Sequence, residues 1–284
     1  MIEVCDLKKA YDGVEAVKGI SFKVEEGALF SFLGTNGAGK STTINILTTL
    51  LEKCSGSVRI GGFDLASQPG QIRTLIGVVF QDSVLDKELT VLENLKVRGS
   101  LYGLKGRELA AAVERVAELT GIGDYGNRLY GKLSGGQRRR ADIARTLIHT
   151  PKLLFLDEPT TGLDPKTRQD IWNLIRKLQK DTGMTIFLTT HYMEEAAESD
   201  DIAIIHKGSI RAQGSPAQLK AQYGFDRLKL TLTDGRQLEQ KLSRTTEALP
   251  IIDHYREQLA HVEIISGTLD EVFLNLTEGG TSLC

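Results

Sequence analysis

The sequence predicts an α/β fold in which a mostly parallel β-sheet is covered by helices. An apolar segment of strand length at 28–33 runs directly into the glycine-rich loop 34–41 (GTNGAGKS), which is followed by a segment of helical composition. A second continuous apolar run at 153–156 is typical of a strand buried on both faces. From 153 to 189 strand, helix and strand alternate, which favours helical connections between parallel strands.

Length, charge and cysteine content limit the possible functions. The chain of 284 residues can bury a substantial core. It carries 35 Lys and Arg against 37 Asp and Glu, so no nucleic-acid partner is expected, because such proteins usually have a basic excess. The run 138–140 (RRR) is interpreted as a solvated helix face or as contacts within the protein. Cys5, Cys54 and Cys284 lack metal-ligand spacing, which favours a reducing compartment.

The sequence shows no membrane-crossing or secretory segment. No stretch approaches the roughly 18–20 apolar residues of a membrane span. The first residues lack the apolar core of a signal peptide. Any role at a membrane is therefore expected to depend on a partner.

The N-terminal half is expected to contain short strands, one helix and a helical insert. Residues 2–7 and 17–24 are rich in strand-forming types around a turn at Asp12 and Gly13. A helix is expected from Lys40 to about residue 51, and a buried strand at 76–80. Apolar periodicity then predicts two amphipathic helices between residues 90 and 119, within a helical subdomain of about 82–145.

The C-terminal half is expected to complete the main domain, residues 1–215, and to add an extension, residues 216–284. A third helix follows Ser134, and a terminal hairpin turns at Lys207 and Gly208. The extension is interpreted as a small α+β unit. Its expected elements are strands at 228–233, 237–242 and 261–265 and a short helix at 269–276.

The glycine-rich loop has the pattern of a phosphate-binding loop. Glycines allow backbone N–H groups to turn inward around a phosphate, and the following helix adds its positive N-terminal dipole. Lys40 supplies charge for the β- and γ-phosphates, and the Ser41 hydroxyl is placed to bind Mg²⁺. A glycine turn that matches by chance is disfavoured by the flanking strand and helix. The predicted nucleotide-binding residues of the loop are Gly34, Thr35, Asn36, Gly37, Ala38, Gly39, Lys40, Ser41 and Thr42.

Two carboxylates follow the apolar strand at 153–156. Asp157 is the expected partner of Mg²⁺, through water, because Mg²⁺ keeps much of its hydration shell. Glu158 is the candidate for orienting the attacking water near the γ-phosphate. The plainer alternative is an acidic helix cap beside Pro159.

The segment 133–137 (LSGGQ) can cap a helix and bind an anion at once. Ser134 and Gln137 have the spacing of a capping box. A cap requires neither Gly135 nor Gly136, whereas two glycines at a helix N-terminus expose backbone donors to an anion. Asp164 likewise is interpreted as an N-cap before a proline at the first helical position.

Together these motifs resemble the nucleotide-binding subunit of an ATP-binding-cassette (ABC) transporter. The resemblance covers roughly residues 1–215. It rests on the glycine-rich loop, Gln81 after a strand, LSGGQ, the two carboxylates, 160–164 (TTGLD) and 189–191 (TTH), in that order. It implies a P-loop NTPase of the ABC ATPase type, with a mixed sheet core, an antiparallel β subdomain and a helical subdomain.

The resemblance also implies a second ABC ATPase subunit, identical or different. Two domains face each other head to tail, and each ATP lies between the loop of one and the LSGGQ segment of the other. In this arrangement Ser134, Gly135, Gly136 and Gln137 contact the nucleotide, and Asp164 lies at the dimer seam.

Four further residues take roles implied by the resemblance. His191 bonds the γ-phosphate, and Gln81 reaches the Mg²⁺ or the water. Tyr11 stacks on adenine, and Val17 packs on the other side of the nucleotide. Alone, such a histidine is usually structural and such a tyrosine is often part of the core. The implied cofactors are ATP and Mg²⁺; the metal residues are Ser41, Gln81 and Asp157, and the catalytic residues are Lys40, Gln81, Glu158 and His191.

Three softer segments resemble drug- and antibiotic-exporter ATPases of the multidrug and daunorubicin-resistance type. They are 80–95 (FQDSVLDKELTVLENL), 138–145 (RRRADIAR) and 268–277 (TLDEVFLNLT). Ordinary amphipathic helices explain their apolar spacing but not the joint match. The expected function is ATP hydrolysis that energises an exporter of drugs, antibiotics or lipid-like compounds. The chain would act at the cytoplasmic face of the membrane, bound to separate transmembrane permease subunits.

Two other classes carry the same motifs. A chromosome or DNA-repair ATPase inserts a long coiled coil before LSGGQ, but Lys40 and Ser134 lie too close in sequence for one, and no heptad run is present. Ribosome-acting members normally carry two cassettes, and this chain has one. A single-cassette soluble ATPase with an assembly role stays the open alternative.

Overall fold

The computed structural model describes residues 1–242 and 244–277, so the end of the extension, with Cys284, lies outside the described residues. The chain divides into two compact units, Met1–Ile210 and Arg211–Cys284. The sequence predicted a boundary near residue 215. Each unit has its own apolar core and is described by itself.

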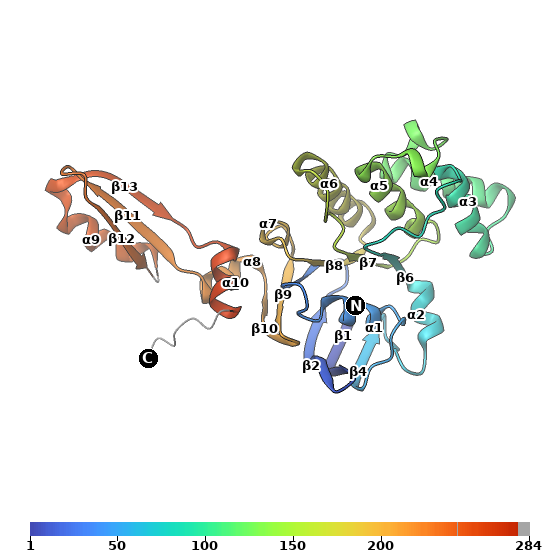
Figure 1. The fold of residues 1–284 in the computed structure, drawn as a ribbon, viewed down its shortest axis with the longest axis horizontal. Coiled ribbons are helices and arrows are strands. Elements are labelled where there is room, and N and C mark those ends of the chain that lie inside the picture. The colour runs from blue at the N-terminus through green and yellow to red at the C-terminus, as the bar shows by residue number, and fades with distance from the viewer. Residues whose placement is uncertain (243, 278–284) are drawn as a thin grey trace. The chain divides into compact units, whose positions relative to one another are not determined.

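The first unit combines an antiparallel sheet, a central sheet and a group of helices (Figure 1). Its strands are β1 (Ile2–Tyr11), β2 (Val14–Val24), β3 (Leu29–Leu33), β4 (Ser55–Ile60), β5 (Phe63–Asp64), β6 (Ile76–Val79), β7 (Leu153–Asp157), β8 (Thr185–Thr190), β9 (Asp201–His206) and β10 (Ser209–Gly214). Its α-helices are α1 (Lys40–Leu47), α2 (Pro69–Leu75), α3 (Val91–Leu101), α4 (Gly106–Thr120), α5 (Gly135–Leu147), α6 (Pro165–Thr182) and α7 (Met193–Ala196). Two short 3₁₀ helices are η1 (Gly123–Tyr125) and η2 (Tyr130–Lys132).

The central sheet has the strand order β10-β9-β3-β8-β7-β6, and all pairings from β9 to β6 are parallel. Strands β3, β7 and β8 are buried along their whole length, as expected for parallel strands covered on both faces. The predicted fold class is therefore confirmed. Because these strands run in one direction, the residues that follow β3, β7 and β8 meet at one edge of the sheet.

An aromatic cluster joins the antiparallel sheet, of order β2-β1-β4-β5, to the central sheet. Phe22 of β2 packs on Phe30 and Phe32 of β3, with ring centroids 5.8 and 5.4 Å apart. Phe187 of β8 lies within 6.1 Å of Phe22 and 5.3 Å of Phe155. Buried aromatic pairs of this geometry add to the burial of apolar area and fix the two layers together.

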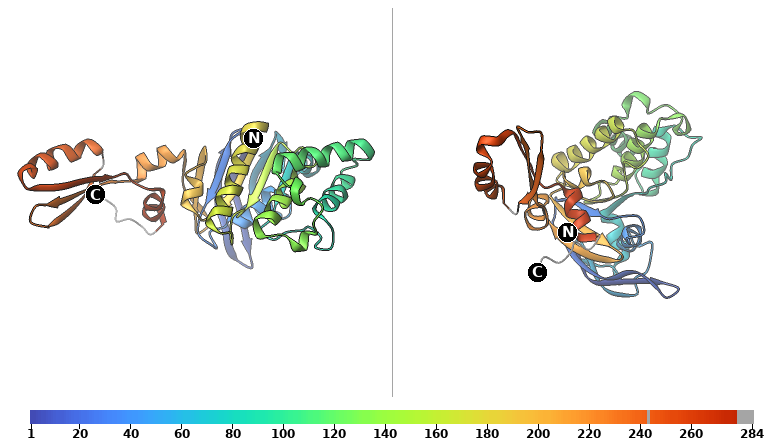
Figure 2. Two further views of the ribbon diagram at one scale, coloured as in Figure 1. Left: turned by 90° about the horizontal axis from the view of Figure 1, so that it is seen from above. Right: turned by 60° about the vertical axis from the view of Figure 1, so that its left-hand side comes forward.

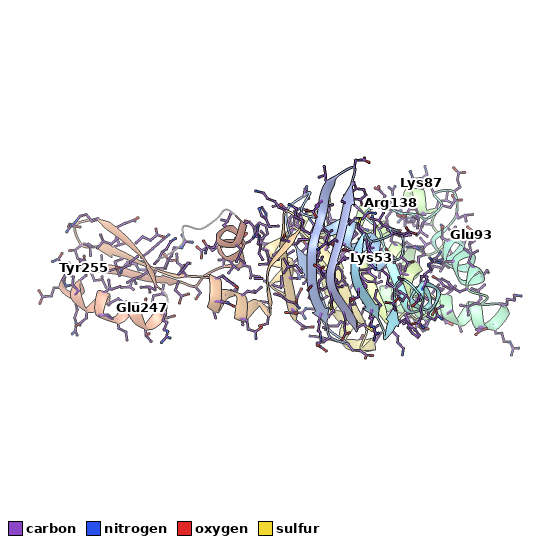
Figure 3. All side chains as sticks on the ribbon, turned by 90° about the horizontal axis from the view of Figure 1, so that it is seen from below. Lys53, Lys87, Glu93, Arg138, Glu247 and Tyr255 are labelled. Atoms are coloured by element: carbon purple, nitrogen blue, oxygen red, sulfur yellow. The ribbon has the colours of Figure 1, made fainter. Side chains whose placement is uncertain are left out.

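The helical subdomain consists of α3, α4 and α5, whose apolar faces share one core with the central sheet and α6. Figure 2 (left) shows α3 and α4 at the end of the first unit remote from β9 and β10. Helix α3 begins with a capping box formed by Thr90 and Glu93, which satisfies two backbone donors of the first turn. Figure 3 shows Lys87, from the segment that leads into α3, and Glu93, from the first turn of α3, on this part of the unit.

The second unit is a small α+β structure, as expected from its sequence. Its elements are α8 (Pro216–Tyr223), β11 (Asp226–Leu232), β12 (Gln237–Leu242), η3 (Thr245–Glu247), α9 (Ala248–His254), η4 (Arg256–Gln258), β13 (Leu259–Ile265) and α10 (Leu269–Thr277). In the antiparallel sheet β12-β11-β13, Leu228 and Leu230 share a core with α9. Figure 3 labels Glu247 and Tyr255, the residues just before and just after α9. Asn275 of α10 donates to the carbonyl of Tyr223 at 2.9 Å, which joins α10 to α8.

Besides the four 3₁₀ helices, the described residues contain six elements that the sequence did not predict: β4, β5, α2, α7, α8 and α9. Strand β4 has weak intrinsic β signals and forms by pairing with β1, for example Val4 with Val58. Helix α1 is shorter than expected, ending at Leu47 rather than near residue 51, because Thr49 adopts a left-handed backbone conformation, with φ at 64°. None of the helices in the described ranges is long and apolar enough to cross a membrane.

Candidate nucleotide site

The glycine-rich loop connects β3 to α1 and lies tightly against its neighbours. A Cβ on Gly34 would lie 2.6 Å from the carbonyl oxygen of Ile205, and one on Gly39 would lie 2.7 Å from that of Ala16. Gly39 also has a φ of 107°, a region open mainly to glycine. Close backbone approach therefore requires glycine at both positions.

Lys40 is held at the centre of the loop. Its side chain is only 4% exposed, and its Nζ donates to the carbonyl oxygens of Gly34 and Thr35 at 2.8 and 3.2 Å. An ammonium surrounded by the loop in this way is placed to bind an anion that the loop encloses. The predicted phosphate-binding role thus has a matching local geometry.

The donor set around the loop fits Mg²⁺ better than a transition metal. Among the described residues no group of three or more His, Cys, Asp or Glu side chains could hold a metal ion alone. What the site offers is the exposed Ser41 at the start of α1 and the carboxylate of Asp157 at the end of β7. One hydroxyl and one carboxylate, completed by phosphate oxygens and water, are the ligands that Mg²⁺ prefers.

Thr189 of β8 contacts both acidic residues at the end of β7, Asp157 through its carboxylate and Glu158 through its backbone N–H. Its Oγ1 donates to Oδ1 of Asp157 at 2.6 Å and accepts from the backbone N–H of Glu158 at 3.0 Å. Burial raises the pKa of Asp157, while this hydrogen bond acts in the opposite direction. Glu158 has a φ of 44°, a strained conformation for a non-glycine residue that is often found at functional sites.

Three side chains converge on the carboxylate of Glu158. Lys40 Nζ lies 3.2 Å from Oε1, Thr161 Oγ1 donates to Oε2 at 3.1 Å, and His191 Nδ1 lies 3.5 Å from Oε2. Burial alone would raise the pKa of Glu158, but the charge of Lys40 and the hydrogen bonds from Lys40 and Thr161 outweigh it. The pKa is therefore lowered, and Glu158 is a carboxylate at neutral pH, as an acceptor for a water proton must be.

His191 is brought to Glu158 by the end of β8. Its Nδ1 makes no hydrogen bond to any described residue, although it lies near the carboxylate. Its ring packs on that of Tyr192, with centroids 4.1 Å apart. The position of the imidazole is therefore set by the backbone and by ring packing.

The LSGGQ segment forms the predicted capped helix start. Ser134 Oγ accepts from the backbone N–H of Gln137 at 3.3 Å, and Oε1 of Gln137 accepts from that of Ser134 at 3.1 Å. The structure adds a second reason for the glycines. A Cβ on Gly136 would clash with Cγ2 of Thr167, and Thr167 itself donates to the cap residue Asp164. The first turns of α5 and α6 thus pack back to back.

Arg139 was not among the predicted site residues. It is buried, so of the two interpretations of the run 138–140, contacts within the protein apply to it rather than a solvated face. Its guanidinium donates to the carbonyl oxygens of Phe80, Gln81 and Glu158 at 2.7, 3.3 and 3.4 Å. It therefore joins the start of α5 to the segment after β6 and to the carboxylate loop. The burial of Arg139 could have been predicted from its spacing. Asp142 and Arg145 follow it by three and six residues, on one buried face of α5.

Tyr11 and Val17 lie on either side of the β1–β2 turn. Tyr11 ends β1 and is 45% exposed, so its ring is available for stacking. Val17 is fully buried, and a Cβ on Gly39 would lie 3.6 Å from its Cγ2. The structure therefore differs from the expectation for Val17: its side chain supports the loop from the core and presents no surface to a nucleotide.

Known proteins share this sequence and this fold. A family model described as "ABC transporter" matches residues 17–161. The daunorubicin/doxorubicin resistance ATP-binding protein DrrA of Streptomyces peucetius is 41% identical over 97% of this chain and 92% of its own length. The linearmycin resistance ATP-binding protein LnrL of Bacillus subtilis is 39% identical over 80% of this chain and 73% of its own. A dimeric ATP-binding cassette in a post-hydrolysis state, bound to ADP and Pi, matches with a TM-score of 0.69 and 28% identity, over 76% of this chain and 98% of that one.

The lowered pKa of Glu158 predicts a change in the pH dependence of catalysis. Thr161→Val removes a hydroxyl that donates to Glu158, so the pKa of Glu158 should rise. Because only the ionised carboxylate can accept a proton from water, a Glu158 that has this role should move the acid limb of the kcat/KM profile, which reports the free enzyme, to higher pH. Thr161→Ser keeps the hydroxyl and should leave the limb in place. An acid limb that stays put in Thr161→Val would contradict the assignment.

Proposed function

The chain belongs to the ABC transporter family, as its motifs predicted, and we propose that it is the ATP-hydrolysing subunit of an exporter of drug-like or antibiotic compounds. It is an ABC ATPase. The observation that carries the proposal is the convergence of Lys40, Glu158 and His191 at the ends of β3, β7 and β8. Phosphoryl transfer depends mainly on positioning and charge stabilisation, which such a cluster supplies.

In the proposed mechanism the loop and α1 bind the phosphates, and Lys40 balances their charge. Mg²⁺, held by Ser41, Asp157 and Gln81, would neutralise charge on the phosphate oxygens. Glu158 accepts a hydrogen bond from the attacking water and orients it. His191, which follows β8, forms a hydrogen bond with the γ-phosphate, and Tyr11 stacks on the adenine base.

The ATP site is proposed to be completed by the LSGGQ segment and Asp164 of a second ABC ATPase subunit. Two features support this. The capped start of α5 keeps Ser134 exposed, with its helix dipole directed outward. The related cassette bound to ADP and Pi is a dimer. The two subunits are two copies of this chain or one copy paired with a related ATPase.

Transport is proposed to take place through separate permease subunits, to which this chain binds at the cytoplasmic face of the membrane. Its relatives are named for resistance to daunorubicin, doxorubicin and linearmycin, which supports export of bulky antibiotics. The compound would be selected by the permease. The helical subdomain, which Arg139 joins to the catalytic loop, would transmit the closure of the dimer.

Glu158→Gln should bind ATP but hydrolyse it at least about 100-fold more slowly, because an amide cannot accept the water proton. ATP should then trap a stable dimer, which size-exclusion chromatography with light scattering can detect. Asp270→Asn, a charge-neutralising change in the second unit, is the matched control. Turnover of Glu158→Gln at the parent rate would remove Glu158 from its role.

Ser134→Asp should abolish hydrolysis without impairing binding of ATP to the single subunit. Aspartate keeps the helix cap but places a negative charge where a partner's γ-phosphate is expected. Ser134→Thr keeps the cap without the charge and should retain most of the ATPase rate. Calorimetry would measure ATP affinity, and a phosphate-release assay would measure turnover. Normal hydrolysis by Ser134→Asp would exclude the cross-subunit site.

The exporter assignment predicts a membrane partner. Purification of the chain from its native membranes in mild detergent should recover a permease polypeptide with about six membrane spans, a size that fits ABC exporters with separate subunits. The permease should stimulate the ATPase rate, and cells that express both should accumulate less daunorubicin than cells that express Glu158→Gln with the permease. Recovery of a soluble assembly instead would favour the single-cassette soluble ATPase.

A further inference from the structure

Glu195 of α7 is a buried carboxylate to which the proposed mechanism assigns no role. It is only 5% exposed. Removal of a carboxylate from water is costly unless hydrogen bonds compensate it. Its partners therefore indicate what the side chain is retained for.

Each oxygen of Glu195 accepts a hydrogen bond from a different threonine. Thr160 Oγ1 donates to Oε1 in a short bond, and Thr190 Oγ1 donates to Oε2 at 2.7 Å. Both threonines are 1% exposed. The hydroxyl of Thr190 also accepts from the backbone N–H of Tyr192 at 2.9 Å, so its geometry is determined on two sides.

The two threonines belong to the two loops that carry the reacting groups. Thr160 lies two residues after Glu158, and Thr190 immediately precedes His191. The carboxylate of Glu195 therefore connects the loop after β7 to the end of β8. These two segments carry Glu158 and His191, whose Oε2 and Nδ1 atoms lie 3.5 Å apart.

We propose that Glu195 is a positioning residue for ATP hydrolysis, which holds Glu158 and His191 in register through Thr160 and Thr190. The proposal rests on the roles proposed above for Glu158 and His191. It does not place Glu195 in contact with nucleotide or water.

Glu158 and His191 both need such support. Glu158 has a strained φ of 44°. Thr189 holds the backbone N–H of Glu158, and the bond from Thr160 to Glu195 holds the chain two residues after Glu158. The Nδ1 atom of His191 makes no hydrogen bond to a described residue, so the ring follows the backbone at Thr190. A misplacement of about 1 Å can lower a rate by about 100-fold, so a small slip between the two loops would matter.

The plainer interpretation is a purely structural cross-link. Ser199→Ala provides the matched control, because the hydroxyls of Ser199 and Ser31 form a buried pair at 2.5 Å in the same unit and bond each other rather than either threonine. A structural role predicts that variants of Glu195 and Ser199 with the same loss of Tm lose activity equally. A positioning role predicts that only Glu195 variants lose it.

The test measures kcat, the Kd for ATP and Tm on the full chain. Glu195→Ala, Thr160→Val and Thr190→Val should each lower kcat by about 10- to 100-fold, while the Kd for ATP stays within about threefold. Thr160→Ser and Thr190→Ser restore the hydroxyl and should recover most of the rate. Ser199→Ala should lower Tm with kcat within about twofold of the parent.

A double-mutant cycle with His191→Ala measures the coupling between Glu195 and His191 in kcat, which a general loss of stability does not produce. Because Glu195 acts in part through His191, Glu195→Ala should lower kcat by a smaller factor when His191 is already alanine than it does in the parent chain, and the factor that remains reports its effect on Glu158. Full additivity, or a normal kcat in Glu195→Ala, would overturn the proposal while leaving the ATPase assignment intact. If Glu158→Gln also turned over normally, the proposed roles themselves would fail. Should Glu195→Ala not fold, the Val and Ser variants of Thr190 decide the question.

Discussion

The parallel pairing of β3, β8 and β7 is the constraint on which the site depends. In register, Leu33 lies beside Thr190, and Asp157 lies beside Thr189, so the loops that follow these strands start side by side. Each loop then contributes one kind of chemistry: a cation from the glycine-rich loop, carboxylates after β7 and an imidazole after β8. Reversal of one strand would move its loop to the opposite edge of the sheet, and no side-chain adjustment could restore the cluster.

Electrostatics and hydroxyl groups complete what strand order begins. Lys40 holds Glu158 ionised in a partly buried place, while Asp157, more deeply buried, has its pKa raised. Two neighbouring carboxylates therefore have different affinities for protons. Thr161 donates to Glu158 and Thr189 donates to Asp157, whereas Thr160 and Thr190 donate to Glu195. Because a hydroxyl both donates and accepts, Thr189 can also accept from the backbone N–H of Glu158.

The sequence predicted the parts of this site that depend on local pattern. The loop at 34–41, the capped start of α5 and the apolar strand before Asp157 each combine a motif with the element it requires, and the structure contains all of these elements. Contacts between distant segments could not be predicted. For Arg139 the sequence left a solvated helix face and contacts within the protein both open, because only the tertiary fold turns it toward the carbonyl oxygens of Gln81 and Glu158. The burial of Val17 has the same origin, since it depends on how β2 packs beneath Gly39.

The packing of α5 on α6 limits how substitutions in the LSGGQ segment can be interpreted. Gly136 has no room for a side chain because Thr167 of the same chain lies against it. Loss of activity in a Gly136 variant would therefore combine a disturbed fold, through Thr167 and the Asp164 cap, with any lost contact to a partner's nucleotide. Ser134 is different, because it is exposed and its side chain takes part in a helix cap that other residues at this position can also form. Among the four residues that we propose contact the partner's ATP, Ser134 is the one whose chemistry can be changed while the fold of its own subunit is kept.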